Sequence, residues 1–203
     1  MYSKPMPPAP GDRDARRLAV SEAVWRVLAA QGFGGLRLRA VAAEMGASTG
    51  LLTHYFPSKR ALLAYALDLL EQRTVADRPE QSAEKGVAAL RAEILRALPL
   101  DEESAADNRI WVGSWDVALS DPELGAEHDR RYRQGLERLR SLVESAQALG
   151  ELPAHCAPED VASSVQGFCL GLVVQALLSP ERYPARRQIR LVEDYLSSLA
   201  QMK

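Results

Sequence analysis

The chain has 203 residues, of which 47% are hydrophobic and 26% charged, enough for one or two domains with a hydrophobic core. Its two cysteines, Cys156 and Cys169, stand thirteen positions apart outside any Cys-x-x-Cys pair, which excludes a disulfide-stabilised scaffold and indicates a reducing compartment. The longest apolar run, residues 167–178, contains Gln175 and is too short to span a bilayer, so we expect a cytoplasmic protein with no membrane partner.

Charge is distributed unevenly along the sequence. Residues 1–60 contain nine Lys and Arg against four Asp and Glu, a net of +5, whereas residues 61–203 contain sixteen against twenty-three, a net of −7. A basic N-terminal third followed by an acidic remainder is typical of a nucleic-acid-binding head on a body that does not bind nucleic acid. Chance clustering of solvated charge is the alternative explanation.

The N-terminal segment, MYSKPMPPAPG, has four prolines in its first ten residues and no apolar core. We expect residues 1–11 to form a disordered tail that is neither a signal peptide nor an anchor. A first helix then starts at Asp12 or Asp14, and its inner stripe consists of Leu18, Val24, Trp25 and Leu28.

Residues 37–59, RLRAVAAEMGASTGLLTHYFPSK, predict two short helices joined by a tight turn. Gly46 stands where the first of them would end in a left-handed residue, and the Ser48 hydroxyl can cap the second, which Pro57 closes. This arrangement is a helix-turn-helix, which places its second helix in the DNA major groove. The same spacing also fits an ordinary pair of helices in an all-α domain.

The second helix of this motif has outward residues suited to DNA. If Leu52 and Phe56 point inward, the residues between them face the groove, where a threonine can bond base edges and a leucine can touch a thymine methyl. Arg39 can reach a guanine edge, and the far end of the helix lies where phosphates would be. The candidate DNA-binding residues are Arg37, Arg39, Ser48, Thr49, Gly50, Leu51, Thr53, His54, Tyr55 and Lys59.

Helical periodicity continues to the C-terminus, and strand signals are nearly absent. A fourth helix over 58–74 links head and body, and caps or helix breakers then separate helices at about 82–98, 104–119, 122–149, 158–178 and 185–201. The prediction is an all-α fold of about nine helices, with a helix-turn-helix domain over 12–57 and a helical body over 58–203.

The sequence offers no support for catalysis. Its three histidines, His54, His128 and His155, are scattered, and no Gly-rich phosphate loop follows a strand. The His155-Cys156 pair has no further ligands at metal spacing. We therefore expect neither an enzyme nor a bound metal or cofactor.

Residues 13–74 resemble the DNA-binding domain of the TetR family of regulators. The matching motifs are Gly32-Phe33, Val41-Ala42, Gly46, Ser48-Thr49-Gly50, His54-Tyr55-Phe56, Pro57-Ser58-Lys59 and Leu62-Leu63. The STGLLTHYF segment, Trp111-Val-Gly-Ser-Trp115 and Asp121-Pro122-Glu123-Leu124 are similar to the BetI-like branch. Leu36-Arg37 departs from the pattern, because the family often has Thr or Ser there as a cap, although Arg37 can still meet a phosphate.

The resemblance implies a homodimer that binds double-stranded operator DNA. It places the interface on the last two helices, where residues 158–178 are apolar over more than one face and Gly167 and Gly171 allow close helix approach. The candidate interface residues are Val165, Gly167, Gly171, Leu172, Val192 and Leu196. An intrachain core would also explain one of the apolar faces.

The resemblance also implies a small-molecule effector bound in the body. Trp111 and Trp115 share a helix face, and the candidate pocket consists of Trp111, Ser114, Trp115, His128, Tyr132, Gln166, Phe168 and Cys169. A quaternary ammonium ligand against aromatic faces is one option, and core packing of the tryptophans is the alternative. A repressor released by its effector is the expected function. An activator, a helical module without DNA binding and an all-α enzyme are the alternatives.

Overall fold

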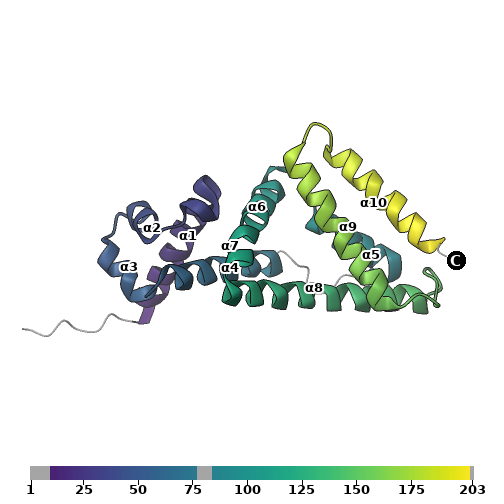
Figure 1. Cartoon of the computed structure of the whole chain (residues 1–203), viewed down its shortest axis with the longest axis horizontal. Coiled ribbons are helices and arrows are strands. Elements are labelled where there is room, and N and C mark those ends of the chain that lie inside the picture. The colour runs from purple at the N-terminus through teal and green to yellow at the C-terminus, as the bar shows by residue number, and fades with distance from the viewer. Residues whose placement is uncertain (1–9, 77–83, 202–203) are drawn as a thin grey trace, which may run out of the picture. The chain divides into compact units, whose positions relative to one another are not determined.

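The computed structural model describes residues 10–76 and 84–201, and every regular element in those two ranges is a helix (Figure 1). The chain divides into two compact units, Met1–Ala76 and Asp77–Lys203. The predicted all-α class is confirmed. The tail over residues 1–9 and the breaker expected at Pro79 lie outside the described residues.

The N-terminal unit contains α1 (Pro10–Gly35), α2 (Leu38–Glu44), α3 (Thr49–Tyr55) and α4 (Lys59–Ala76). The buried stripe of α1 runs through Val20, Val24, Val27 and Leu28 at helical spacing. Leu18, which we expected on this stripe, is 61% exposed, because it lies two residues before Val20 and therefore on the opposite side of the helix.

Helix α4 packs within the N-terminal unit. Its residues Leu62, Leu63, Ala66 and Leu67 are buried, and α4 contacts α1. We had assigned residues 58–74 to the body as its link to the head. By its contacts, this helix instead groups with the first three helices, and the division between the two units falls after Ala76.

The C-terminal unit contains α5 (Gly86–Ala97), α6 (Glu102–Gly113), α7 (Trp115–Ser120), α8 (Pro122–Ala148), α9 (Pro158–Leu178) and α10 (Ala185–Ala200). Helix α8 packs against α5, α7 and α9, and α10 packs against α5 and α9. Their shared core includes Leu90, Ile94, Val143, Ala162, Val165 and Val192.

Local sequence explains where α6 and α8 begin. Asp101 accepts a hydrogen bond from the Ser104 backbone N–H at 2.8 Å and completes a capping box at the start of α6. Asp121 caps α8, which has proline in its first turn. Helix α5 is different, since its Val87 N–H donates to the carboxylate of Glu151, 64 residues further along the chain, at 2.7 Å.

One predicted helix is interrupted in the structure. We expected a single helix over 104–119, but α6 ends at Gly113 and α7 begins at Trp115. The Ser114 hydroxyl donates to the carbonyl oxygen of Trp111 at 2.6 Å, which satisfies a carbonyl at the end of α6. The helix over 158–178 has the predicted bounds, and the helices over 82–98, 122–149 and 185–201 are present with shifts of one to four residues at their ends.

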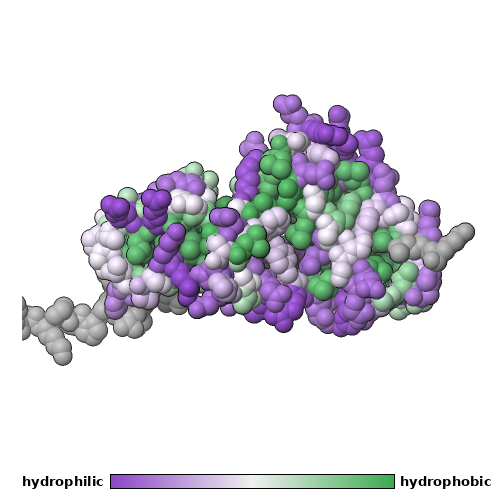
Figure 2. All heavy atoms as spheres, viewed as in Figure 1, coloured by the Kyte–Doolittle hydropathy of each residue, from purple (hydrophilic) through white to green (hydrophobic). Residues whose placement is uncertain are grey.

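Helix α9 is the most apolar helix of the described part of the chain. It has 21 residues, and by length and composition alone it could cross a membrane, a test that core helices of soluble proteins also pass. Only 39% of its apolar window is buried within the chain. Figure 2 shows hydrophobic residues at the surface over this helix, bordered by hydrophilic ones. Helix α9 therefore has a second apolar face, which the core of one chain does not cover.

Candidate DNA-binding surface and effector site

Two buried side chains anchor α3 in the N-terminal unit. Leu52 is 0% exposed and Phe56 is 5% exposed, as the sequence predicted, and the Phe56 ring lies 5.2 Å from the ring of Tyr65 on α4. Gly46 has φ +62°, the expected left-handed end of α2, and the following N–H of Ala47 donates to Ala42 at 2.9 Å. The turn and the two anchors fix which face of α3 points outward.

That outward face carries most of the predicted DNA-binding residues. Within α3, Gly50, Leu51, Thr53 and His54 are exposed, and Thr49 and Tyr55 are half-buried. Before and after the helix, Ser48 and Lys59 are exposed. Ser48 is the N-cap residue, but its hydroxyl makes no capping hydrogen bond, which corrects the capping role we expected. The hydroxyl therefore remains available to a partner outside the helix.

Thr53 has a hydrogen bond that the sequence did not predict. Its hydroxyl donates to the carbonyl oxygen of Gly50 at 2.8 Å. The hydroxyl proton is therefore engaged within the helix, as is common for threonine in helices. What Thr53 offers outward is an acceptor oxygen and a methyl group.

The basic residues near α3 are exposed. Arg37 is the N-cap residue of α2 and makes no side-chain capping bond, in agreement with the missing Thr or Ser at this position. Arg37, Arg39 and Lys59 form no ion pair within the described residues. Arg26 of α1, by contrast, pairs with Glu44 at 2.6 Å and so ties α2 to α1. Arg37, Arg39 and Lys59 are the three cations that the sequence assigned to DNA.

In the C-terminal unit, four of the predicted pocket residues form one aromatic cluster, defined here as Trp111, Ser114, His128 and Tyr132. The rings of Trp111 and His128 lie 4.8 Å apart, and those of Trp111 and Tyr132 lie 5.8 Å apart. Ser114 Oγ lies 3.1 Å from His128 Nε2. The cluster joins the end of α6 to the first half of α8.

The hydrogen bonds of Ser114 determine the tautomer of His128. The single hydroxyl proton of Ser114 is donated to the Trp111 carbonyl, so its oxygen must accept from His128. The imidazole proton therefore lies on Nε2, and Nδ1 is a free acceptor. His128 is 4% exposed, and its buried Nδ1 has no hydrogen-bond partner in the structure.

The rings of the cluster carry no charge of their own at pH 7, although the cationic Arg131 lies close to His128. Burial, helped by the nearby charge of Arg131, lowers the pKa of His128 from 6.5 to about 4, so the imidazole is neutral at pH 7. Burial also raises the pKa of the Tyr132 phenol, an effect partly offset by the nearby indole N–H groups of Trp111 and Trp115. Trp115 Nε1 is buried without a hydrogen-bond partner. The Trp115 indole N–H is thus an unused donor, and His128 Nδ1 is an unused acceptor, beside the aromatic rings.

The other predicted pocket residues lie in different surroundings. The side-chain amide of Gln166 on α9 donates to the backbone carbonyl of Tyr132 at 3.1 Å and so links α9 to the cluster. Phe168 stacks on Tyr195 of α10 with ring centroids 4.1 Å apart. Cys169 lies in the core, where burial raises its pKa to about 12. The structure therefore groups Gln166 with the cluster and separates Phe168 and Cys169 from it.

Four of the six predicted interface residues are buried in the core of the chain itself. Val165, Leu172, Val192 and Leu196 all belong to this core, so they are not free to meet a partner, which corrects that assignment. Gly167 and Gly171 are exposed, on a stripe of α9 that also includes Ser164, Leu170, Val174 and Leu178. Hydrophobic periodicity identified two apolar faces of α9 but not which of them points inward.

Metal-binding geometry is absent from the described ranges, 10–76 and 84–201, where no group of three or more His, Cys, Asp or Glu residues gathers. Cys156 and Cys169 are free cysteines.

Two family models match the chain. Residues 20–66 match the model described as bacterial regulatory proteins of the tetR family. Residues 86–201 match the model of the C-terminal domain of BetI-type transcriptional repressors. The first match contains the helix-turn-helix, and the second contains the aromatic cluster and helices α9 and α10.

Similar proteins extend over nearly the whole chain. The regulator PksA of Bacillus subtilis is 28% identical over 193 residues, which is 93% of this chain and 91% of PksA. The regulator BetI of Paraburkholderia phymatum is 28% identical over 195 residues, 95% of this chain and 96% of that protein.

Solved structures share the fold. A transcriptional regulator from Rhodococcus has a TM-score of 0.79 at 24% identity, covering 91% of this chain and 95% of its own. A structure from Saccharomonospora viridis, titled as a regulator in complex with choline, has a TM-score of 0.78 at 21% identity and covers 91% and 96%. The chain therefore belongs to the TetR family of bacterial transcriptional regulators, and its C-terminal domain is of the BetI type.

Proposed function

We propose that this protein is a cytoplasmic, dimeric repressor that binds a two-fold symmetric operator through α3 and leaves it when a small cation binds in the body. The observation that carries the proposal is the outward face of α3. Leu52 and Phe56 are buried and fix the inner face of the helix, while its exposed side is rich in small and hydroxylated residues. Regulators of this family bind operator DNA and effectors and act as dimers.

On this proposal, base contacts and phosphate contacts come from different residues. Arg39 reads a guanine edge, and Thr49, Leu51 and the Thr53 methyl contact bases in the groove. Arg37 and Lys59, at the edges of the motif, bind phosphates and set the position of the helix. Gly50 leaves room for close approach, because a Cβ there would meet only the Ser48 hydroxyl within 4 Å.

The dimer forms through the uncovered apolar stripe of α9, together with α10. Gly167 and Gly171 have open space where a Cβ would stand, so the backbone of a second chain can approach closely. Leu178, at the end of the stripe, is 78% exposed. Pairing of two chains covers this surface and also provides two recognition helices for a symmetric operator.

The aromatic cluster is the proposed effector site, and its chemistry suits a quaternary ammonium ion that bears a hydroxyl group. The rings of Trp111 and Tyr132 offer faces to a cation, and the neutral His128 adds no charge to that of the nearby Arg131. A ligand hydroxyl can donate to His128 Nδ1 and accept from Trp115 Nε1–H, which satisfies both buried groups. The BetI relatives and the choline complex of the Saccharomonospora structure support this choice.

The test is an electrophoretic mobility shift of the DNA upstream of the protein's own gene, with and without choline. We expect a specific shift that choline reverses. Trp111→Leu and Trp115→Leu should keep DNA affinity without ligand and lose the choline response, since a ligand acts only through its different affinity for two states. Release by choline that is unchanged in both variants would place the effector site elsewhere.

Lys59→Ala tests a proposed phosphate contact of the N-terminal unit. Its matched control is Lys85→Ala, because Lys85 is also exposed but lies at the start of α5. Only Lys59→Ala should weaken DNA binding. A protein that shifts no DNA but still binds choline would be the helical binding module that the sequence left open. A reporter gene whose expression falls when the protein is deleted would identify an activator.

A further inference from the structure

The side chain of Tyr65 on α4 joins three helices of the N-terminal unit. Its ring lies 5.2 Å from the ring of Phe56, the residue at which α3 ends, with 56° between the two planes. Its hydroxyl is hydrogen-bonded to the hydroxyl of Ser21 on α1. One half-buried tyrosine therefore connects the end of the proposed recognition helix both to α4 and to α1.

The chain between α3 and α4 forms a short, stiff corner. The Phe56 N–H donates to the carbonyl oxygen of Leu52 at 2.8 Å and so ends α3. Phe56 itself is extended, with φ −126° and ψ 94°, as a residue before proline prefers, and Pro57 has a fixed φ of its own. The Ser58 hydroxyl then accepts from the Ala61 N–H at 3.1 Å and caps the first turn of α4. Because both helix ends are fastened, α3 has little freedom to move independently of α4.

The hydroxyl pair holds the tyrosine ring against α1. Helix α1 is a firm support, since its Val24 and Leu28 are buried in the core of the unit. Phe56 is buried as well, and its ring meets the ring of Tyr65. Leu52 fixes α3 at one point of its inner face, and Phe56 fixes it at a second. The position of Tyr65 therefore determines how α3 is tilted about Leu52.

We propose that Tyr65 is a positioning residue for DNA recognition, which acts on α3 through Phe56 and is itself held by Ser21. This inference rests on the proposed contact of α3 with operator DNA. Without the hydroxyl bond, α3 samples other tilts, and the apparent operator affinity falls with the fraction of molecules in the competent pose. Base contacts depend on that pose, whereas binding to random DNA depends mainly on phosphate attraction and changes less.

The experiment removes the two hydroxyl groups singly and together. Fluorescence anisotropy measures affinity for a duplex from the DNA upstream of the protein's own gene and for a random duplex of equal length. Tyr65→Phe and Ser21→Ala should each weaken operator binding roughly threefold to tenfold, the effect of one hydrogen bond on an equilibrium. Random DNA should be affected roughly twofold at most. The double variant should lose no more than either single variant, because both remove the same bond.

Two further variants separate positioning from general stability. Ser21→Thr keeps a hydroxyl and should bind the operator like the parent. Tyr183→Phe is the matched control, because it removes a hydroxyl that donates to Gln175 in the C-terminal unit, and both DNA affinities should be retained. Alanine favours helix more than serine does, so Ser21→Ala should keep a thermal midpoint close to that of the parent. A purely structural role instead predicts a lower midpoint with unchanged operator affinity of the folded chain.

Hydrogen exchange of residues 49–56 gives a reading that does not depend on DNA. Exchange should be faster in Tyr65→Phe and Ser21→Ala than in the parent and in Tyr183→Phe. Operator affinity that both hydroxyl variants retain would overturn the proposal, and so would equal weakening on operator and random DNA. A parent that binds no operator would contradict the proposed function, and unchanged exchange would then still overturn the role of Tyr65 in holding α3.

Discussion

The outward face of α3 and the aromatic cluster of the C-terminal unit place functional residues in opposite ways. In α3, two buried side chains fix a short helix, and the residues that we propose to act are exposed between them. In the cluster, the proposed residues are themselves wholly or partly buried, and their hydrogen bonds decide what they can offer. The outward residues of a surface site can therefore be predicted from periodicity, whereas what a buried site offers depends on hydrogen bonds that the sequence does not show.

The largest expected effect comes from breaking the support of α3. Leu52→Ala removes a fully buried side chain and should lower the free energy of unfolding of the N-terminal unit by about 2–5 kcal/mol. Hydrogen exchange of residues 38–67 measures this loss. The neighbouring Leu51→Ala, at an exposed position, should leave exchange nearly unchanged, and equal losses in both variants would contradict the assignment of faces.

The second effect concerns the buried imidazole of the cluster. Because the pKa of His128 falls from 6.5 to about 4 on folding, the unfolded chain binds a proton between these values that the folded chain does not. The free energy of unfolding should therefore decrease as pH falls through this window, by up to roughly 3 kcal/mol at pH 4. His128→Gln cannot titrate, so urea denaturation at pH 7 and pH 4.5 should show a smaller pH dependence in this variant than in the parent. Identical pH dependence would contradict a buried neutral His128.

The third effect tests the uncovered stripe of α9. Gly171→Glu places a charge where the single chain has open space, so the protomer should fold, fail to dimerise and lose operator affinity about a hundredfold. Analytical ultracentrifugation and mobility shift measure both losses. Ala126→Glu, at an exposed position of α8, is the control. A folded Gly171→Glu protein that still sediments as a dimer would place the interface elsewhere.

The smallest effects separate base contacts from phosphate contacts in the head. Arg39→Ala should cost about 1–3 kcal/mol of operator binding and relax discrimination at one base pair. Lys59→Ala should weaken operator and random DNA alike and reduce the slope of affinity against salt by about one unit. Competition binding at several salt concentrations distinguishes them, and equal losses on both DNAs for Arg39→Ala would contradict its role in base reading.

The sequence was most informative where local rules determine the structure. Gly46 at the end of α2, the inward Leu52 and the fold class were all predicted from spacing and turn chemistry and are confirmed. Membership of a family of regulators also confirms the expectation that the protein is not an enzyme. The turn, the inward face and the fold class depend on residues close together in the chain. Family membership depends on a motif whose many residues stand at fixed spacings.

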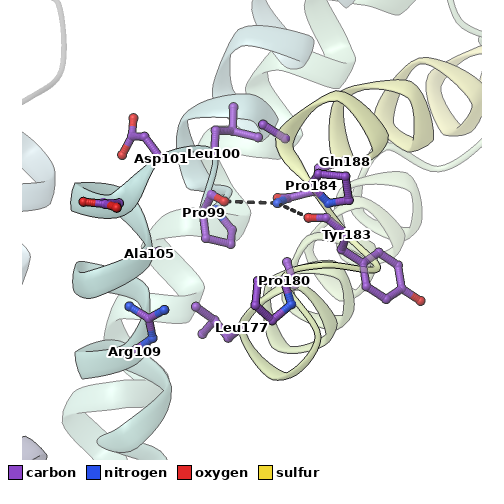
Figure 3. A pocket seen from close by; sticks show the side chains of 13 residues that line it. Pro99, Leu100, Asp101, Ala105, Arg109, Leu177, Pro180, Tyr183, Pro184 and Gln188 are labelled. Carbon is purple, nitrogen blue, oxygen red and sulfur yellow. Dashed lines mark hydrogen bonds between the residues drawn. The ribbon is translucent and has the colours of Figure 1, made fainter.

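The sequence was least informative where distant residues decide the outcome. Val165 and Gly171 lie on the same apolar helix, and only packing against α8 and α10 shows that Val165 belongs to the core. The break between α6 and α7 falls at Ser114, whose hydroxyl is bonded to Trp111 and His128, and helical periodicity records neither the break nor these bonds. Gln188 of α10 donates to the carbonyl oxygen of Pro99, 89 residues earlier in the chain, a contact that no local pattern predicts (Figure 3).

The start of α5 is held by a residue from a distant part of the chain. The first turn of this helix is held by Glu151, and the backbone of Gly86, at φ +61°, lies so close to that carboxylate that any Cβ would collide with it. The C-terminal unit thus fastens its own first helix through a carboxylate that lies 64 residues further along the chain. Protein engineers who shorten this unit or join it to another DNA-binding head should therefore keep Gly86 and Glu151 together.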